Sequence, residues 1–175
     1  SALTLAATML DAAGEHPEAS RLIRRRLGSF LDTAPSGDHA HLWRLAYPKA
    51  FSPLLDEVAT EAGIPPAFLR AIAREESQFN PRAVSVAHAY GLVQLIEPTA
   101  RRFARELGLP SRPEDLKRAE VNARIGARFM RFIFDRYGGN AAMVPPSYNA
   151  GYGATDRWLR ASSDVHLDEW IEAIE

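Results

Sequence analysis

The stretch from residue 119 to residue 137 most constrains what this chain can fold into. Its apolar side chains recur at helical spacing and leave one polar stripe, formed by Arg124, Arg128, Arg131 and Asp135. A helix that is apolar on most sides is stable only when other helices surround it, so we expect this one to be the central core helix. The apolar positions are Val121, Ile125, Phe129, Met130, Phe132, Ile133 and Phe134.

Proline and glycine recur along the chain in the order that marks the beginnings and ends of helices. Proline is favoured in the first turn of a helix, and glycine just past its last residue. Such pairs bracket residues 17–28, 53–63 and 98–108. Alternation of apolar and polar residues is scarce, and no Asn-Gly or Asp-Gly turn lies between alternating stretches. We therefore predict an all-α fold.

The composition excludes several classes of protein. The 175 residues are 46% hydrophobic, and 21 Lys and Arg balance 22 Asp and Glu. A chain of this kind buries a core, and it has no apolar run near the roughly 18 residues that a membrane span needs. The balanced charge gives no overall basic field for nucleic acid. Because cysteine is absent, disulfides, thiolate zinc sites and a cysteine nucleophile are excluded.

The amino-acid composition of the chain changes near residue 50. The first part is rich in Ala and Leu, continues into an Arg-studded helix and then reaches a Pro-Ser-Gly loop. We expect residues 1–50 to form short helical hairpins, like the end of a helical repeat or a linker region. Residues 51–175 are expected to form the main helical domain.

Two glutamates lie on the apolar side of the helix expected over residues 68–79. At 100° per residue, Glu75 and Glu76 both fall within the apolar arc, opposite Arg70 and Arg74. A carboxyl group held against apolar neighbours has a raised pKa and can act as a general acid. The alternative is that both glutamates reach solvent and pair with the arginines. Periodicity does not choose between the two glutamates.

Four sequence blocks, in this order, carry a family resemblance over about residues 64–170. They are IPPAFLRAIAREESQFNP, then GLVQLIEPTA, then NARIGARFM with YGGNAAM, and finally SYNAGYGATDRWL. Together they resemble the catalytic domain of the soluble lytic transglycosylases of glycoside-cleaving family 23. These lysozyme-like enzymes cut bacterial peptidoglycan. The family's catalytic Glu directly precedes Ser, so the resemblance points to Glu76 rather than Glu75.

The resemblance implies cleavage of the β-1,4 bond between N-acetylmuramic acid and N-acetylglucosamine without water. Glu76 would protonate the leaving oxygen, and its carboxylate would then take the proton of the sugar's own C6 hydroxyl as that oxygen attacks C1. A 1,6-anhydro sugar results. The matching blocks hold no second Asp or Glu in an obvious nucleophile role, which fits a mechanism with one carboxyl group.

The resemblance also implies the partners and the location. By motif position, the substrate would contact Ser77, Ser85, Gln94, Tyr148 and Asn149, with Tyr148 also expected to contact the Glu76 carboxyl. On residue type alone, Asn149 and Gly151 fit an ordinary helix end equally well. The implied partner is the peptidoglycan glycan strand, in the bacterial cell envelope, periplasmic or exported. The chemistry needs no metal, nucleotide or redox cofactor, and the sequence predicts no particular oligomeric state.

The chain departs from the family pattern at several positions. His88 stands where the family usually has Gly, Val93 where it has Met, and residues 145–147 read Pro-Pro-Ser where it has Ala. We expect the His88 ring to narrow the cleft and the two prolines to interrupt the helix before Tyr148. The terminal DEWIEAIE resembles the start of a longer family segment, so the chain is expected to end inside the domain.

Two other functions remain open at this point. One is a hydrolytic lysozyme of the goose type on the same fold, in which water replaces the C6 hydroxyl. The other is a catalytically silent helical module that binds glycan or a partner protein, an alternative that the departures at His88 and Pro145 leave open.

Two further signals are weaker. His39 and His41 lie two residues apart, which puts them on opposite sides of a helix, so we predict no metal site. The arginines of residues 21–26 are typical of a solvated helix face, but they could also contact an anionic polymer, either nucleic acid or the acidic stem peptides of peptidoglycan. We predict no nucleic-acid partner.

Overall fold

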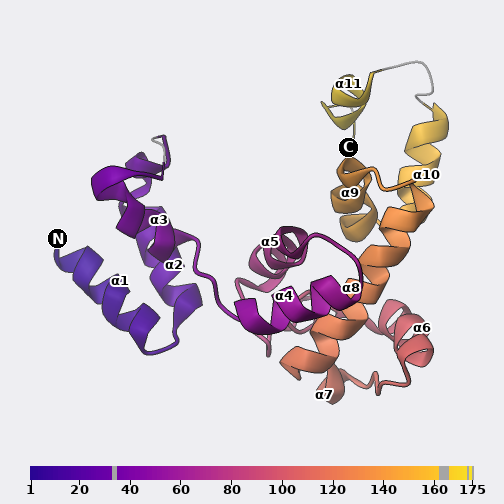
Figure 1. The fold of residues 1–175 in the computed structure, drawn as a ribbon, viewed down its shortest axis with the longest axis horizontal. Helices are drawn as coiled ribbons and strands as arrows, with labels where there is room; N and C mark the ends of the chain where they lie inside the picture. The colour runs from indigo at the N-terminus through magenta and orange to yellow at the C-terminus, as the bar shows by residue number, and fades with distance from the viewer. Residues whose placement is uncertain (33–34, 162–165, 173, 175) are drawn as a thin grey trace.

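The chain is mostly helical in the computed structural model, which describes residues 1–32, 35–161, 166–172 and 174 (Figure 1). The predicted all-α class is confirmed. The described α-helices are α1 (Ala2–Ala12), α2 (His16–Arg26), α3 (Ala40–Ala46), α4 (Ser52–Glu61), α5 (Pro66–Ser77), α6 (Glu97–Leu107), α7 (Pro113–Leu116), α8 (Ala119–Arg136), α9 (Val144–Asn149), α10 (Tyr152–Ala161) and α11 (Leu167–Glu172).

The three proline–glycine brackets correspond to α2, α4 and α6. Each of these helices has proline in its first turn, where the missing amide hydrogen has no partner within the helix. Gly108 follows α6 in the left-handed region, at φ +66°, and closes that helix with bonds to carbonyls of the last turn. The sequence punctuation therefore predicts these helices correctly.

Helix α8 is the core helix, as its pattern predicts. Ten of its residues are buried, and α4, α6, α7 and α9 all pack against it. Figure 1 shows it running through the middle of the larger group of helices, with α5 on one side and α6 on the other. Its polar stripe faces outward, where Arg124, Arg128 and Arg131 form ion pairs.

Two hydrophobic clusters divide the buried residues of the described chain. The larger cluster runs from Ala50 to Val144 and is centred on α8. The smaller one joins α1, α2 and α3 through Ala7, Ile23 and Leu45. Figure 1 shows these three helices as a separate group, connected to α4 by a single passage of chain. The predicted division at residue 50 stays a prediction.

No helix among the described residues is long and apolar enough to cross a membrane.

The only β-strands among the described residues form a short hairpin between α5 and α6. Strands β1 (Ala89–Tyr90) and β2 (Leu95–Ile96) are antiparallel, with Ala89 opposite Ile96 and Tyr90 opposite Leu95. Each strand has two residues, too few for the alternation that a sequence pattern would reveal. This hairpin brings the loop of residues 83–94 to the end of α5.

Candidate active site

The last turn of α5 separates the two candidate glutamates. Glu75 is exposed, with 63% of its side chain accessible, and its Oε1 accepts a bond of 2.9 Å from Arg74 Nε. The expectation that Glu75 lies against apolar neighbours is therefore wrong. The alternative, that Glu75 reaches solvent and pairs with an arginine, is confirmed. Glu76 is half-buried, and no hydrogen bond or ion pair of its carboxyl is found among the described residues.

The electrostatic setting of Glu76 favours its protonated form. Burial raises the pKa of the Glu76 carboxyl above its ordinary value, and the negative charge of neighbouring Glu75 raises that pKa further. Within the described residues, no cation lowers the pKa of Glu76 against these two effects. A carboxyl with this setting holds its proton to a higher pH than an exposed glutamate does, as a general acid requires.

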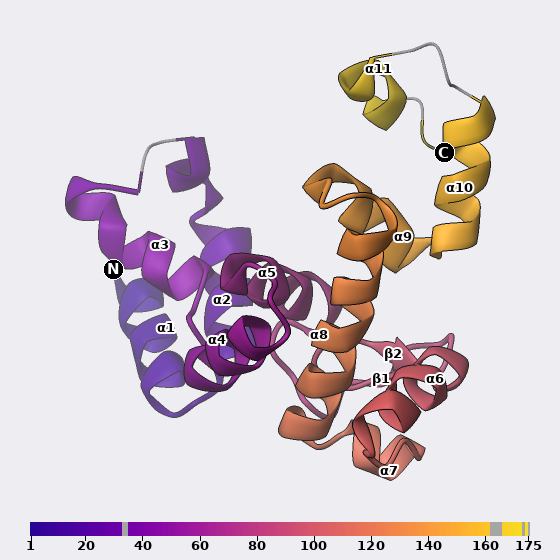
Figure 2. The same ribbon diagram turned by 45° about the vertical axis from the view of Figure 1, so that its right-hand side comes forward.

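Glu76 lines an open cleft of about 460 Å³. The cleft lies where the end of α5, the β1–β2 hairpin and the turn between α9 and α10 come together. Figure 2 shows the hairpin beside α6. Glu76 is the single acidic residue among the described residues of the lining. The others are Ser85, Ala87, Ala89, Gln94, Leu95, Ile96, Thr99, Phe129, Tyr148, Asn149, Ala150, Gly151 and Tyr152.

Tyr148 lies deep in this cleft, on α9. Its ring packs on Phe129 of α8, with centroids 5.2 Å apart, and its hydroxyl donates a 2.8 Å hydrogen bond to the Val93 carbonyl. Burial raises the pKa of the Tyr148 phenol well above its usual range, and the charge of nearby Glu76 raises it further. The phenol is thus a neutral donor beside Glu76. Its bond in the structure is to Val93, not to the carboxyl group we expected.

A buried amide holds the Val93 peptide in place. Asn122 on α8 accepts a 2.9 Å bond from Val93 N–H at its Oδ1, and its Nδ2 donates a 2.8 Å bond to the Tyr90 carbonyl. A methyl group at Gly126 would lie 2.4 Å from Val93 Cγ2, so only glycine allows this close approach. The hairpin, Asn122 and Tyr148 therefore form one connected support behind the cleft.

The other predicted residues play different parts. Ser85, Gln94 and Asn149 line the cleft. Gln94 Nε2 donates to the carbonyls of Gly91 (2.9 Å) and Ala83 (3.3 Å), which braces the loop. Ser85 Oγ accepts a bond from the Ala89 amide at 3.1 Å.

Ser77 is the exception among the predicted substrate contacts. It is not one of the residues that line the cleft. Its hydroxyl donates to the carbonyls of Ala73 (3.0 Å) and Leu92 (2.7 Å), the second of which ties α5 to the hairpin loop. The structure therefore gives Ser77 a bracing position rather than one at the cleft surface.

Two sequence departures act differently from what we expected. His88 is exposed and does not line the cleft; its backbone has φ +55°, a left-handed conformation that glycine adopts more easily, which is a physical reason for glycine at this position. Pro145 and Pro146 do not interrupt α9. They occupy its first turn, where no amide hydrogen is needed, and the Ala150 amide bonds to the Pro146 carbonyl at 2.9 Å.

Sequence reasoning missed part of the lining and the support. Thr99, Phe129 and Tyr152 line the cleft without having been singled out for it. Asn122 carried a usable signal, because a lone amide within an apolar helix needs partners when it is buried. Thr99 and Tyr152 carried no signal of this kind, since their position depends on how α6 and α10 pack.

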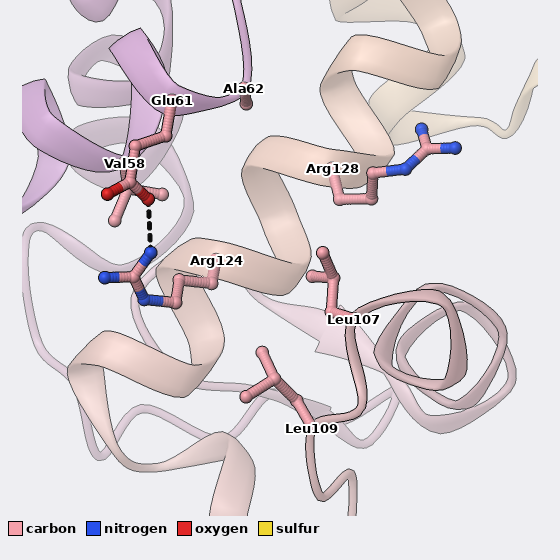
Figure 3. A pocket seen from close by; sticks show the side chains of 7 residues that line it. All are labelled: Val58, Glu61, Ala62, Leu107, Leu109, Arg124 and Arg128. Atoms are coloured by element: carbon pink, nitrogen blue, oxygen red, sulfur yellow. Dashed lines mark hydrogen bonds and ion pairs between the residues drawn. The ribbon is translucent and has the colours of Figure 1, made fainter.

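A second hollow of about 400 Å³ lies between α4, α6 and α8 (Figure 3). It is lined by Val58, Glu61, Ala62, Leu107, Leu109, Arg124 and Arg128. Its acid differs from Glu76, because the Glu61 carboxylate is paired directly with Arg124, the contact drawn in Figure 3. The Glu61 carboxylate is thus engaged in an ion pair, whereas no ion pair of the Glu76 carboxyl is found among the described residues.

His39 ends a short 3-10 helix and His41 lies in the first turn of α3. Among the described residues, no three His, Cys, Asp or Glu side chains lie close enough to hold a metal ion. His41 Nε2 instead shares a 3.1 Å hydrogen bond with Thr8 Oγ1.

The fold and the cleft define a class: a helical domain that presents one unpaired, half-buried carboxyl in an open groove, backed by a tyrosine. The Transglycosylase SLT domain matches residues 53–171, and the chain belongs to this family.

Known proteins share this fold along most of the chain. The soluble lytic murein transglycosylase of Escherichia coli K12 is 32% identical over 131 residues, which are 73% of this chain and 20% of that protein. An inactive mutant of the lytic transglycosylase Slt from Pseudomonas aeruginosa, in which a glutamate is changed to glutamine, superposes with a TM-score of 0.80 and 28% identity. That match covers 95% of this chain and 25% of the other. The chain thus spans about a fifth to a quarter of these relatives.

Proposed function

We propose that the chain is a peptidoglycan lytic transglycosylase whose single catalytic residue is Glu76. The observation that carries the proposal is the setting of this carboxyl: it is half-buried, it has a raised pKa, it has no basic partner in the part of the chain that the structure describes, and it lines an open cleft. The family membership and the names of the relatives support the same activity.

In the first step, the protonated Glu76 carboxyl gives its proton to the glycosidic oxygen as the bond from C1 to that oxygen breaks. The positive charge that develops at C1 is stabilised by the N-acetyl group of the sugar and by protein dipoles. In the second step, the Glu76 carboxylate takes the proton of the C6 hydroxyl while O6 bonds to C1. The 1,6-anhydro product forms and Glu76 is protonated again, so no water is consumed.

The other predicted site residues, four in the cleft lining and Ser77 behind it, are assigned supporting roles. Gln94 and Asn149 line the groove with amide groups, which suit the hydroxyl and N-acetyl groups of a sugar. We assign Tyr148 to orienting the sugar and the acid through its neutral hydroxyl. Ser85 and Ser77 fix the loop that forms one wall. Because peptidoglycan is the substrate, we place the protein in the bacterial cell envelope, periplasmic or exported.

Digestion of purified peptidoglycan, with the products weighed by mass spectrometry, tests this function. Lytic cleavage gives 1,6-anhydromuramyl ends, whereas reducing ends of the hydrated mass would identify a hydrolytic lysozyme of the goose type. Glu76→Gln should abolish product formation, and Glu75→Gln is its matched control. A wild-type chain that binds peptidoglycan and releases nothing would identify a silent binding module.

A further inference from the structure

The arginines of α2 line a hollow of about 360 Å³ that lies outside the proposed cleft. Arg21, Arg24 and Arg25 fall on one side of α2 and are exposed, and the lining is completed by Ser20 and Gln78. We call this site the α2 hollow. An arginine-bearing helix face is usually solvated, but here the three side chains border a concave space.

The positive charge of the α2 hollow is only partly neutralised. Among the described residues, Glu18 is the one carboxylate within ion-pair distance of the three arginines, and it lies 3.9 Å from Arg21 Nη1. Arg24 lies over the ring of Tyr47, with its guanidinium carbon 5.7 Å from the ring centroid. This contact orients the guanidinium without removing its charge. The hollow is therefore built to accept an anion.

The α2 hollow adjoins the end of the catalytic helix. Arg21 Nη2 donates a 3.4 Å hydrogen bond to Gln78 Oε1, and Gln78 is the residue that caps α5. Gln78 follows Glu76 by two residues, so their Cα atoms are at most about 7.6 Å apart. The α2 hollow therefore borders the C-terminal end of the helix whose last turn carries Glu76.

We propose that the α2 hollow binds the carboxylates of the peptide that hangs from the muramic sugar. This inference rests on the proposed function, which places that sugar at Glu76. The stem peptide starts on the sugar's lactyl group and carries free carboxylates, which guanidinium groups bind in a planar, two-pronged geometry. Nucleic acid would instead need a long track of positive charge, and this chain has a net charge of −1.

The test compares two substrates: peptidoglycan with its peptides, and glycan strands from which an amidase has removed them. The variant combines Arg21→Gln, Arg24→Gln and Arg25→Gln. We expect its KM for intact peptidoglycan to rise about tenfold, the equivalent of about 1.4 kcal/mol, with kcat unchanged. Its KM for the stripped strands should equal that of the wild type. Equal effects on both substrates, or no effect on either, would overturn the proposal.

A matched control removes the same charge elsewhere: Arg101→Gln, Arg105→Gln and Arg118→Gln, three exposed positions outside both hollows. It should leave both KM values unchanged. NMR detection of free stem tetrapeptide binding to the chain separates the proposed function from the proposal that the α2 hollow binds the peptide. If the wild type cuts neither substrate, the proposed function fails, while peptide binding that the α2 variant loses still supports the hollow. If a DNA duplex binds more tightly than the peptide, and the triple α2 variant loses this DNA binding, the proposed peptide site is contradicted.

Discussion

The cleft at Glu76 and the hollow at Glu61 are alike in size and differ in how each treats its acid. Both are open spaces, of about 460 and 400 Å³, and both are bordered by α8. At the hollow of Figure 3, Arg124 binds Glu61 and also lies 3.4 Å from Glu57 and 3.3 Å from Glu120. At the cleft, Glu76 faces a tyrosine and apolar groups.

The comparison shows that the partner of a carboxyl group, rather than the presence of a cavity, decides what it can do. Arg124 stabilises charged carboxylates around it, which makes the hollow at Glu61 a structural network between α4 and α8. Glu76 has a neighbour of its own sign and partial burial, and both favour the proton. The two sites therefore predict opposite outcomes for the same chemical change.

The largest effect is expected when each acid is changed to its amide. Glu76→Gln removes the proton donor and should lower kcat on peptidoglycan by about 10²- to 10⁴-fold, the usual contribution of general acid–base catalysis. Glu61→Gln should leave kcat within about twofold. Turnover is measured by release of soluble muropeptides. Equal losses in the two variants would contradict the distinction between the sites.

The next effect concerns the close packing behind the cleft. A methyl group at Gly91 would lie 2.2 Å from the Leu116 carbonyl oxygen, and Gly91 has φ +83°. We expect Gly91→Ala to lower the free energy of unfolding by more than about 3 kcal/mol. Gly108→Ala is the matched control, because Gly108 also has positive φ but faces open space; it should cost about 1 kcal/mol. Urea denaturation measures both, and similar losses would refute the packing argument.

Tyr148→Phe tests whether the tyrosine hydroxyl matters to the cleft beyond its packing. The change leaves the Val93 carbonyl without its donor and should lower kcat by about 10- to 100-fold. Tyr137→Phe is the control, since Tyr137 does not line the cleft; its hydroxyl donates to Asp156 Oδ1 (2.9 Å) and to the backbone carbonyl of the lining residue Tyr152 (3.1 Å). If both variants lose activity equally, Tyr148 has only a structural role.

Glu75→Gln sharpens the electrostatic side of the comparison. Removing this charge should lower the pKa of Glu76, because that pKa is raised by two effects, burial and the negative charge of Glu75. The acid must be protonated to act, so the high-pH limb of the kcat/KM profile should move to lower pH, while activity at the optimum changes by less than about threefold. A limb that stays in place would show that Glu75 does not influence the acid.

The smallest effect is on stability. A carboxyl whose pKa is raised on folding binds its proton more tightly in the folded chain, so its contribution to stability is present at low pH and is lost as pH rises through the folded pKa. Glu76→Gln should therefore raise the melting temperature at pH 7 and have little effect near pH 4. Parallel melting scans at the two pH values check this sign; a variant less stable at pH 7 would contradict it.

Much of the fold follows from sequence because its helices carry local signals. The apolar circumference of α8 and the prolines of α2, α4 and α6 act within a few residues, so the sequence predicts these elements. The hairpin loop does not have such a signal. His88 and Gln94 take left-handed backbone conformations, at φ 55° and 46°, without being glycine. Tertiary contacts impose these conformations, and no local pattern reveals them.

The sequence predicts the candidate site only in part, because local signals reveal its helices but not the tertiary contacts between them. Helical spacing predicted both Glu75 and Glu76 on the apolar side of α5, which is wrong for the exposed Glu75. Burial of Glu76 and exposure of Glu75 depend on how the hairpin and α9 pack against α5. The bond from Tyr148 to Val93 joins residues 55 positions apart. Ser77 was expected at the substrate and instead braces Leu92. Contacts of this range follow from packing, which the order of motifs does not specify.

The titration of Glu76 itself tests the account most directly. Carboxyl carbons of the folded chain, labelled with ¹³C and followed by NMR from pH 3 to pH 9, give one glutamate signal that disappears in Glu76→Gln and is thereby assigned. We predict that its midpoint lies above 4.5, the ordinary value for glutamate, and falls in Glu75→Gln. A midpoint at or below 4.5 would contradict the claim that this cleft keeps an acid protonated for catalysis.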